Sequence, residues 1–475
     1  MKRETYKTGN AIIATAQHST NRNNDIHLHS HMLVVNQTYD KNTSTYKALN
    51  LDFNQIKEVN AVMSTELMKN VRELGYEIEI RENAQWNIKG FDEHIIDAMS
   101  TRKQEIMNVL DKLSDGEIGV DTARNIAYET KNAKDVTITK EQIQSRAREQ
   151  IQSVGATIEE LKQNAMSKEK YQNHFSSAKE VLEKAGEHLS DSNARFTQRE
   201  LLMAASSISN GEYSYKDLKD ELDTVKKTGQ KEGQELKRLG TDKNTGQEIF
   251  TTKEMHQMEK QNLEFVRRNV QVEAIMTKEQ AQAGLADFED KYFKLTQGQY
   301  DAAMNILSST DQIGIVQGYA GSGKSSMFKS VAHSMAFYEN NNEVLLTAVA
   351  NKAVSGGVEA SKMDNGESFI GQTLHKTTRG GLEEVMTNNQ KSQTKLLIIE
   401  EASMASAKDI NKILNDVNNL KTDGYNIKIQ LVGDKNQLLP IGSGSPFEQF
   451  QKELQDRVVM MDESQRQRTI TQQEI

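Results

Sequence analysis

Gly318-Tyr319-Ala320-Gly321-Ser322-Gly323-Lys324-Ser325-Ser326 decides the fold of the C-terminal part of this chain. The stretch fits G-x-x-x-x-G-K-[ST], in which glycines let backbone N–H groups close around phosphates at a helix N-terminus. Residues 311–317 predict a short buried strand before it, and residues 325–338 predict a helix after it. This context is the one the motif requires, so we expect Lys324 to reach the β- and γ-phosphates and Ser325 to hold Mg2+. The alternative is a chance match in a glycine-containing turn.

Length and composition bound the remaining possibilities. The chain has 475 residues, enough for two to four domains, and its hydrophobic content of 36% supports globular cores. The net charge of −9 gives no global sign of nucleic-acid binding, so any DNA contact requires a local basic groove. The absence of cysteine excludes disulfides and thiolate metal sites. With no long apolar run and a polar start, we expect a cytoplasmic protein without membrane insertion.

The first 290 residues show mixed patterns. Strands are predicted at 11–16 and 32–35 around a polar loop at 20–25, a helix at 55–75, strands at 76–81 and 85–88, and a helix at 92–113. Residues 114–190 are strongly polar and helical, either a solvated connector or a mobile segment. Capping boxes at 197–200, 214–217 and 251–254 and a hairpin turn at 244–246 indicate a winged-helix-like order of two helices and a hairpin.

From about residue 293 strands and helices alternate. The strands 314–317, 344–348, 396–399 and 427–432 are almost continuously apolar, which is typical of a parallel sheet covered on both faces. We therefore expect a multidomain α/β chain with divisions at 1–113, 114–193, 194–290 and 291–475.

Two acids follow one of these strands. In Leu396-Leu397-Ile398-Ile399-Glu400-Glu401-Ala402-Ser403-Met404, one acid is expected to hold Mg2+ and the other to orient or deprotonate the attacking water. We assign Glu400 to the metal and Glu401 to the water. A pair of acids after a strand is common in proteins, so this assignment depends on the phosphate loop that precedes it in the chain.

The motif order resembles that of RecD-like helicases of superfamily 1. Leu295-Thr296-Gln297-Gly298-Gln299, the phosphate loop, residues 347–352, Glu400 to Met404, the motif III segment 433–440 and Arg466-Gln467 follow one another as in that family. The resemblance implies a RecA-like P-loop lobe that uses ATP and Mg2+. Its candidate nucleotide-binding residues are Gly318, Ala320, Gly321, Ser322, Gly323, Lys324, Ser325, Ser326, Gln299 and Glu400.

The same resemblance assigns individual roles. Gln299 is expected to contact adenine, Gln437 to sense the γ-phosphate, and Arg466 to contact the γ-phosphate across a lobe interface. A further set, Thr347, Asn351 and Lys352, is expected to touch single-stranded DNA. The family usually has Asp-Glu where this chain has Glu400-Glu401, and the extra methylene is expected to misplace the metal ligand and slow hydrolysis. The chain ends at Ile475, so the second lobe is expected to be missing.

His18, His29 and His31 form H-x10-H-x-H near the N-terminus. His29 and His31 lie two apart, on the same side of a strand, and His18 can reach them from a neighbouring strand. Three neutral imidazoles can hold a divalent metal with positions open for a phosphate oxygen. The alternative is a surface histidine cluster near a loop. His27 lies on the same face at a different spacing.

This region resembles the three-histidine motif of conjugative relaxases. Thr8-Gly9-Asn10, residues 18–22 and 28–31, Leu74-Gly75-Tyr76 and Met99-Ser100-Thr101-Arg102 carry the resemblance. It implies part of an α+β (HUH) relaxase fold whose metal polarises the scissile DNA phosphate. The family's nucleophilic tyrosines lie upstream of the matched region, so no catalytic tyrosine is assigned, and nicking by this chain alone is not expected. Tyr6 and Trp86 are interpreted as a strand-edge aromatic and a packing residue.

A relaxase domain followed by a RecD-like helicase is the arrangement of TraI/TrwC-type relaxase–helicases. The resemblance implies unwinding of element DNA during conjugation, with single-stranded DNA, a coupling protein and relaxosome accessory proteins as partners. Separate polypeptides supplying the missing ends remain an open alternative. One rival is an ATP-binding, single-stranded-DNA-binding remnant without turnover, and the other is a decaying reading frame without activity.

Overall fold

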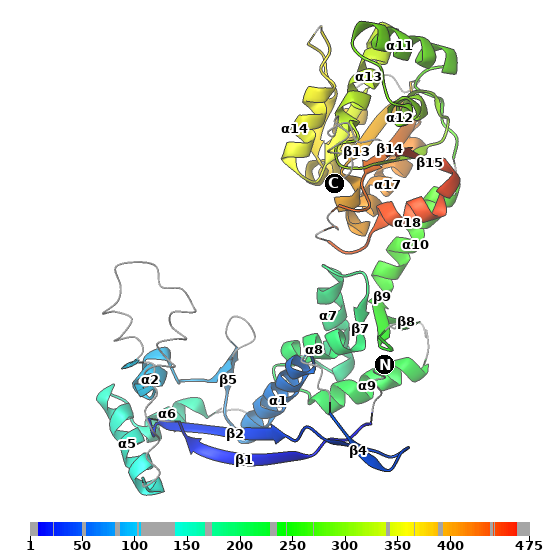
Figure 1. Cartoon of the computed structure of the whole chain (residues 1–475). Coiled ribbons are helices and arrows are strands. Elements are labelled where there is room, and N and C mark those ends of the chain that lie inside the picture. The colour runs from blue at the N-terminus through cyan, green and yellow to red at the C-terminus, as the bar shows by residue number, and fades with distance from the viewer. Residues whose placement is uncertain are drawn as a thin grey trace, which may run out of the picture. The chain divides into compact units, whose positions relative to one another are not determined.

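The computed structural model describes residues 8–21, 23–49, 54–80, 86–101, 104–105, 138–166, 173–228, 235–243, 245–268, 270–338, 343–364, 366–387, 393–437, 440 and 442–462 (Figure 1). The chain divides into two compact units. One contains residues 1–182 and 202–223, and the other contains residues 183–201 and 224–475. Mixed antiparallel and parallel sheets with helices confirm a multidomain α/β protein.

The first unit begins with an antiparallel hairpin. Strands β1 (Ile13–Thr20) and β2 (Ile26–Val34) pair with His18 opposite His29, around a turn at 21–25. A second hairpin follows, made by β3 (Thr38–Asp40) and β4 (Thr45–Lys47). Its turn is closed by Asp40, which accepts hydrogen bonds from the Asn42 N–H at 3.0 Å and the Thr43 hydroxyl at 2.6 Å. Strands β1 and β2 are the two strands that were expected around the polar loop.

Helix α1 (Asn54–Glu73) and the short pair β5 (Ile78–Ile80) and β6 (Trp86–Ile88) agree with the sequence pattern. The helix ends before Gly75, whose φ of +87° favours glycine. The Trp86 indole donates to Ser64 Oγ at 3.0 Å, so this residue packs against α1. Gly211 also lies against α1, because a Cβ there would stand 2.6 Å from the Met68 Cβ.

The helix expected over 92–113 is interrupted. Helix α2 covers Glu93–Ala98, and helical residues return at Thr101, Gln104 and Glu105. At the start of that second stretch, the Thr101 N–H donates at 3.0 Å to the carboxylate of Asp25. A partner 76 residues away in the chain is invisible to a periodicity argument. Residues 106–113 lie outside the described part of the chain.

Helices α5 (Lys140–Ser153) and α6 (Ile158–Ala165) occupy the polar segment, each opened by a complete capping box. Ile151 of α5 and Leu161 of α6 form a small core with Ile95 of α2. This part of the expected connector is therefore packed, and it is not only a solvated link.

A small antiparallel sheet lies in the second unit, with the order β7 (Phe196–Thr197), β9 (Glu248–Thr252), β8 (Leu236–Thr241). Along the chain, α7 (Ala178–Ser190) precedes this sheet, and α8 (Gln198–Ser209) and α9 (Tyr215–Thr228) come between β7 and β8. Thr197 and Glu200 form the expected capping box, as do Ser214 and Asp217.

The capping box expected at 251–254 was wrong by one residue. Helix α10 (Lys253–Arg268) starts after Thr252, whose hydroxyl accepts from the Met255 N–H at 3.2 Å. The Thr251 hydroxyl instead donates to the Ala194 carbonyl at 2.7 Å. Strand β9 therefore extends one residue further than the sequence pattern indicated.

A six-stranded parallel sheet forms the centre of the second unit. Its order is β12 (Ile370–Thr373), β11 (Val344–Ala348), β13 (Lys395–Glu400), β14 (Ile427–Gly433), β10 (Ile313–Gly318) and β15 (Val458–Met461). The four strands expected from apolar runs are confirmed. The two edge strands were missed because they are short and partly exposed.

Helices cover both faces of this sheet, as the apolar strands require (Figure 1). One core contains residues of α11 (Lys278–Lys291), α12 (Gln297–Ser308), α13 (Lys324–Phe337) and α14 (Asn351–Ala360). The other contains residues of α10, α15 (Leu374–Lys376), α16 (Leu382–Met386), α17 (Ala407–Thr422) and α18 (Pro446–Glu453). None of the helices in the described residues is long and apolar enough to cross a membrane.

Candidate nucleotide site and three-histidine cluster

The phosphate loop joins the fully buried strand β10 to helix α13. Gly321 and Gly323 have φ of +82° and +84°, a conformation that a side chain would strain. Lys324 opens the helix, and its ammonium donates to the Gly318 carbonyl at 2.9 Å. Ser325 follows it on the exposed first turn. The backbone therefore presents N–H groups and the helix N-terminus to one small volume, as an anion site requires.

Gln299 supports this loop from behind. Its carboxamide Nε2 donates to the Ser322 carbonyl at 3.0 Å, and its Oε1 accepts from the Thr296 N–H at 3.0 Å. The side chain is 2% exposed. In this arrangement the amide of Gln299 holds the loop and caps α12, and it does not face solvent where a base would lie.

The acid pair lies at the end of β13. Glu401 adopts a left-handed conformation with φ of +50°, which is strained for a residue with a side chain and is typical of functional turns. Burial, and then the charge of Glu401, raises the pKa of Glu400 to about 7, against the lowering effect of Lys324. The Oε2 atom of Glu400 is buried and has no hydrogen-bond partner within the described ranges. A carboxylate oxygen left over in this way fits a role as a ligand to a hydrated Mg2+.

This pKa predicts how pH affects stability. The pKa of Glu400 lies above its ordinary value of 4.5, so the carboxyl stabilises the fold below pH 4.5 and this stabilisation is lost as pH rises through about 7. We expect Glu400→Gln to become progressively more stable than the wild type between pH 5 and 8, by no more than about 3 kcal/mol. Urea midpoints of both proteins without Mg2+ measure this. A constant difference across the range would contradict the prediction.

The loop after β14 carries the expected γ-phosphate sensor. The backbone turns at Asp434, whose carbonyl accepts from the Gln437 N–H at 3.0 Å. Gln437 itself is half-buried at the end of this turn. Arg466 lies outside the described residues.

The expected DNA residues divide into two groups. Asn351 and Lys352 are exposed at the start of α14, where a strand of DNA can reach them. Thr347 is fully buried, and its hydroxyl bonds the Thr377 hydroxyl at 2.9 Å. The expectation of direct DNA contact by Thr347 was therefore wrong for its side chain, because that side chain faces the inside of the lobe.

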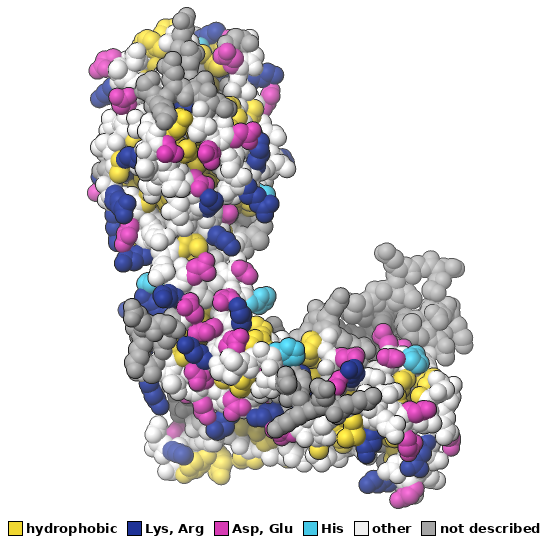
Figure 2. Space-filling model, turned by 180° about the vertical axis from the view of Figure 1, so that it is seen from behind, with side chains coloured by type: hydrophobic (Ala, Val, Ile, Leu, Met, Phe, Trp, Pro, Cys, Tyr) yellow, Lys and Arg dark blue, Asp and Glu magenta, His cyan; other side chains and the backbone are white. Residues whose placement is uncertain are grey.

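Three exposed basic side chains near the same edge were missed. His375, Lys376 and Arg379 follow β12, which pairs in parallel with β11, so both strands end on the same side of the sheet. The helix there is kinked at Arg379 and Gly380, with φ of +95° at the glycine. Figure 2 shows cationic and acidic side chains interspersed on the face it displays, as the net charge of −9 suggests. A local group such as this one is therefore the kind of basic feature required for DNA contact.

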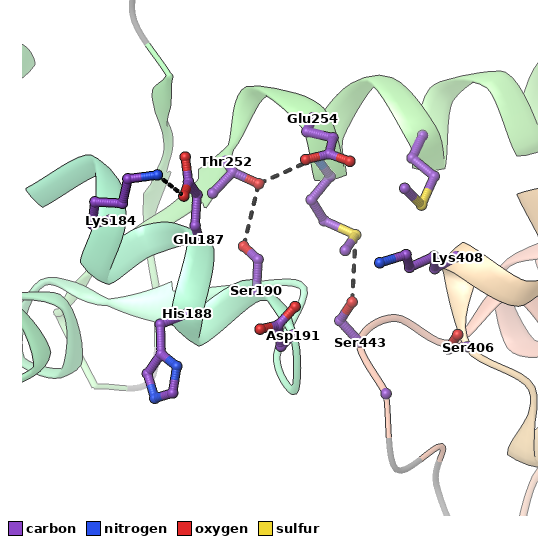
Figure 3. Close-up of a pocket in the computed structure, with 13 residues that line it drawn as sticks. Lys184, Glu187, His188, Ser190, Asp191, Thr252, Glu254, Ser406, Lys408 and Ser443 are labelled. Atoms are coloured by element: carbon purple, nitrogen blue, oxygen red, sulfur yellow. Dashed lines mark hydrogen bonds and ion pairs between the residues drawn. The ribbon is translucent and has the colours of Figure 1, made fainter. Parts of the chain in front are cut away.

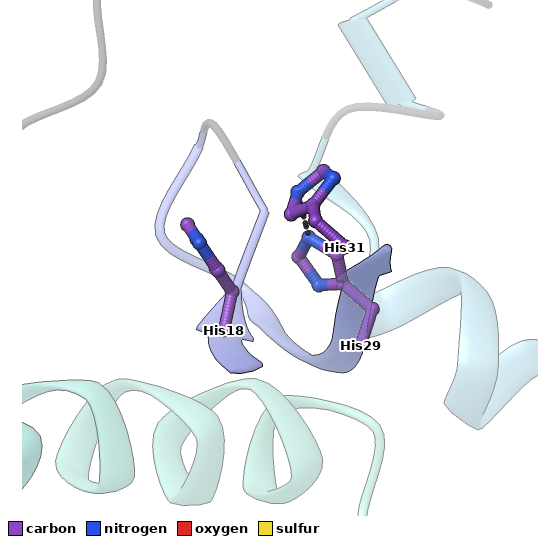
Figure 4. A group of neighbouring side chains, drawn as sticks. All are labelled: His18, His29 and His31. Atoms are coloured by element: carbon purple, nitrogen blue, oxygen red, sulfur yellow. Dashed lines mark hydrogen bonds between the residues drawn. The ribbon is translucent and has the colours of Figure 1, made fainter. Parts of the chain in front are cut away.

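The three histidines come together on the β1–β2 hairpin (Figure 4). Their candidate ligand atoms all lie within 4.8 Å of one another. The ring centroids of His18 are 5.4 Å from His29 and 4.9 Å from His31. His29 Nδ1 lies 2.8 Å from the His27 carbonyl, which favours the tautomer that leaves Nε2 for a ligand. The donor set and its spacing fit a divalent metal with imidazole ligands.

Asp25 fixes the turn between the two histidine-bearing strands, and no sequence pattern pointed to it. This carboxylate is 2% exposed. It accepts hydrogen bonds from the Thr101 hydroxyl at 2.7 Å, Gln150 Nε2 at 3.2 Å and Asn21 Nδ2 at 2.9 Å. Gln150 belongs to α5, so the polar helical segment supports the histidine hairpin.

A separate cavity of about 570 Å³ lies between α7, the start of α10 and the loops at 406–408 and 442–443 (Figure 3). Its walls mix lysines, acids and methionines. Met255 Sδ accepts from the Ser443 hydroxyl at 3.8 Å, which ties α10 to the loop after Gly442. The mixed charge favours no particular ligand.

Comparison with known families gives two matches. Residues 1–154 match the TrwC relaxase family, and residues 294–475 match the AAA domain family. The histidine cluster lies in the first range and the phosphate loop in the second. The chain therefore carries a TrwC relaxase domain and a nucleotide-binding AAA domain on one polypeptide.

Individual relatives match parts of this chain. Multifunctional conjugation protein TraI of Escherichia coli is 32% identical over 113 residues, which cover 22% of this chain and 6% of TraI. TraI of strain K12 is 29% identical over 180 residues, covering 37% and 9%. Uncharacterized protein MJ1519 of Methanocaldococcus jannaschii is 28% identical over 171 residues, covering 33% and 14%. The chain thus spans only a small part of the length of each.

Solved structures of conjugative relaxase TrwC in complex with oriT DNA are also similar. The metal-free form has a TM-score of 0.28 at 21% identity, covering 32% of this chain and 54% of that one. The metal-bound form has a TM-score of 0.29 at 21% identity, covering 31% and 52%. The two domains and the homology to TraI together confirm the resemblance to TraI/TrwC-type relaxase–helicases.

Proposed function

We propose that this chain is the ATP-driven, single-stranded-DNA-translocating part of a conjugative relaxase–helicase, linked to a metal site for nicking at a transfer origin. The observation that carries the proposal is the phosphate loop, with Lys324 and the acid pair Glu400 and Glu401 beside it at one edge of a parallel sheet. A carboxylate that is influenced by the loop lysine can share the Mg2+ of a bound nucleotide. Such a protein would work in the cytoplasm with single-stranded DNA, a coupling protein and relaxosome accessory proteins.

The residues divide the work of a superfamily 1 ATPase as follows. Backbone N–H groups of residues 318–326 hold the phosphates, and Lys324 neutralises the charge on the transferred one. Ser325 and Glu400 hold Mg2+, while Glu401 orients the attacking water. Gln437 senses the γ-phosphate, and Arg466 contacts it. Gln299 acts by holding the loop from behind, as its contacts to Ser322 and Thr296 support.

Single-stranded DNA lies along the carboxyl ends of β11 and β12 in this proposal. Asn351 and Lys352 contact it from the first turn of α14, and His375, Lys376 and Arg379 contact it from the kinked segment after β12. The Thr347–Thr377 hydrogen bond of 2.9 Å joins β11, the strand before α14, to the kinked segment. A shift of the kinked segment would therefore act on β11.

The histidine cluster is the second part of the proposal. A divalent metal would be held by His18, His29 and His31, and it would act as a Lewis acid on a phosphate oxygen of DNA. The hairpin orients the three imidazoles, and Asp25 keeps its turn in place. The donor spacing within 4.8 Å supports this assignment.

A binding module without turnover is the alternative that one observation favours. A pKa of about 7 leaves Glu400 partly protonated near neutral pH, which weakens it as a metal ligand. ATP binding would then persist while hydrolysis is slow.

ATP hydrolysis with and without single-stranded DNA tests the proposal. We expect DNA to stimulate turnover and Glu401→Gln to abolish turnover while retaining nucleotide binding. The pair Lys376→Ala and Arg379→Ala is expected to reduce the stimulation and to lower the slope of log affinity against log salt by about 1.4, since each removes a phosphate contact. Nucleotide binding without turnover in the wild type would favour the alternative, and no nucleotide binding would refute both.

A further inference from the structure

Gln317 is the last residue before the phosphate loop and the centre of a buried hydrogen-bond network. Its side chain is 1% exposed in β10. The Nε2 donates to Asp434 Oδ1 at 2.9 Å, and the Oε1 accepts from the Lys435 N–H at 3.1 Å. The same Oε1 accepts from Gln451 Nε2 of α18 at 2.8 Å. One amide therefore contacts two consecutive residues of the motif III loop.

These contacts define the shape of that loop. Asp434, 4% exposed, also accepts from the Asn436 N–H at 3.0 Å, so its carboxylate organises the turn that ends at Gln437. Gln317 holds the carboxylate by one end of its amide and the following backbone N–H by the other. If this amide is removed, the Asp434 oxygen and the Lys435 N–H lose a partner inside the protein, which is costly for buried polar groups.

The position of Gln317 links the loop to the nucleotide site. The next residue, Gly318, gives its carbonyl to Lys324 at 2.9 Å. A ligand that draws Lys324 away from that carbonyl changes the backbone directly attached to Gln317. The side chain of Gln317 then transmits this change to Asp434 and Lys435, without touching the nucleotide.

We propose that Gln317 is a positioning residue that couples the phosphate loop to the motif III loop and sets where Gln437 lies when a nucleotide binds. The proposal rests on the proposed nucleotide function of the loop. A buried glutamine that serves stability alone is the competing interpretation, and the chain offers a matched example. Gln312, the residue just before β10, is 3% exposed, and within the described residues its amide donates to one group, the Ile427 carbonyl at 3.4 Å.

The experiment compares Gln317→Leu with Gln312→Leu by hydrogen exchange, with and without a non-hydrolysable ATP analogue, and by ATP hydrolysis. Without nucleotide, we expect Gln317→Leu to speed exchange of residues 433–437 about tenfold. With the analogue bound, the phosphate loop of Gln317→Leu should be protected from hydrogen exchange, while residues 433–437 should not. Turnover should fall about tenfold, with nucleotide affinity within about threefold of the wild type. Gln312→Leu should match the wild type in all these measurements.

A swap separates positioning from bulk stability. Gln317→Glu places a second carboxylate against Asp434, whereas Gln317→Glu with Asp434→Asn restores the hydrogen bond between positions 317 and 434 with donor and acceptor exchanged, and keeps an oxygen at position 317 for Lys435 and Gln451. We expect the single variant to behave as Gln317→Leu and the double variant to recover coupling. If Gln317→Leu behaves as Gln312→Leu, or if the double variant stays as defective as the single one, the proposal is overturned.

The two proposals fail in different ways. If the analogue protects no part of the wild-type phosphate loop, the nucleotide function is wrong. Exchange of residues 433–437 in the nucleotide-free variants still decides whether Gln317 holds the loop.

Discussion

Lys324→Ala is expected to lower nucleotide affinity by at least about 100-fold, because it removes the only side-chain cation of the loop motif from a site built for phosphate. In the nucleotide-free protein the Lys324 ammonium is held at the Gly318 carbonyl, 2.9 Å away, and is therefore already placed inside the loop. Titration with a fluorescent ATP analogue measures the effect. Turnover, where the wild type shows it, should be lost with binding.

Lys412→Ala is the matched control for this prediction. The Lys412 side chain is exposed on α17 of the same lobe and pairs with Asp416 at 2.6 Å, and it belongs to none of the motifs of the site. Its replacement removes one positive charge without changing the loop. Equal affinity in the wild type and Lys324→Ala would mean that the nucleotide does not bind at residues 318–326.

His29→Ala is expected to lower the affinity for a divalent metal by at least about 100-fold. Replacing a group outside the ligand shell usually costs 10- to 100-fold, and the loss of one ligand out of three costs more. His29 lies opposite His18 in the hairpin and two residues from His31, so it is the member that joins the other two. Co2+ binding followed by its visible spectrum gives both the affinity and the coordination geometry.

His27→Ala separates this site from a general histidine cluster. His27 lies on the same strand and stacks on His29 with ring centroids 4.6 Å apart, but it is not one of the three grouped ligands. We expect its replacement to change the metal affinity by less than about threefold. A loss as large as that of His29→Ala would show that the ligand set is wrong.

Short sequence patterns predicted most of the fold and the central residues of both candidate sites. The phosphate loop, the four inner strands of the parallel sheet, the amphipathic helix α1 and the spacing of the three histidines depend on neighbours within a few residues. Glycine at positive φ, apolar runs and two-residue alternation are all properties of short stretches. For that reason they were recognisable before any contact was known.

Several expectations failed where a partner distant in the chain decided the outcome. The helix expected over 92–113 is interrupted, and the Thr101 N–H donates to Asp25 over a separation of 76 residues. Thr347 was expected at the DNA and is buried against Thr377. The edge strands β12 and β15 are only four residues long and partly exposed, so they did not stand out as strands in the sequence.

The sequence by itself determined which residue types can bind phosphate and metal, because those choices follow from local backbone and side-chain chemistry. Only the tertiary structure decided which polar side chains are held in place and which groups are their hydrogen-bond partners. Fully buried Lys428, for example, donates to the carbonyls of Asn305, Ile306 and Ser309 at 2.7–2.8 Å and closes the end of α12. Buried polar side chains must find partners, and those partners lie wherever the fold brings them, more than a hundred residues away for Lys428 and for Gln317 with Asp434.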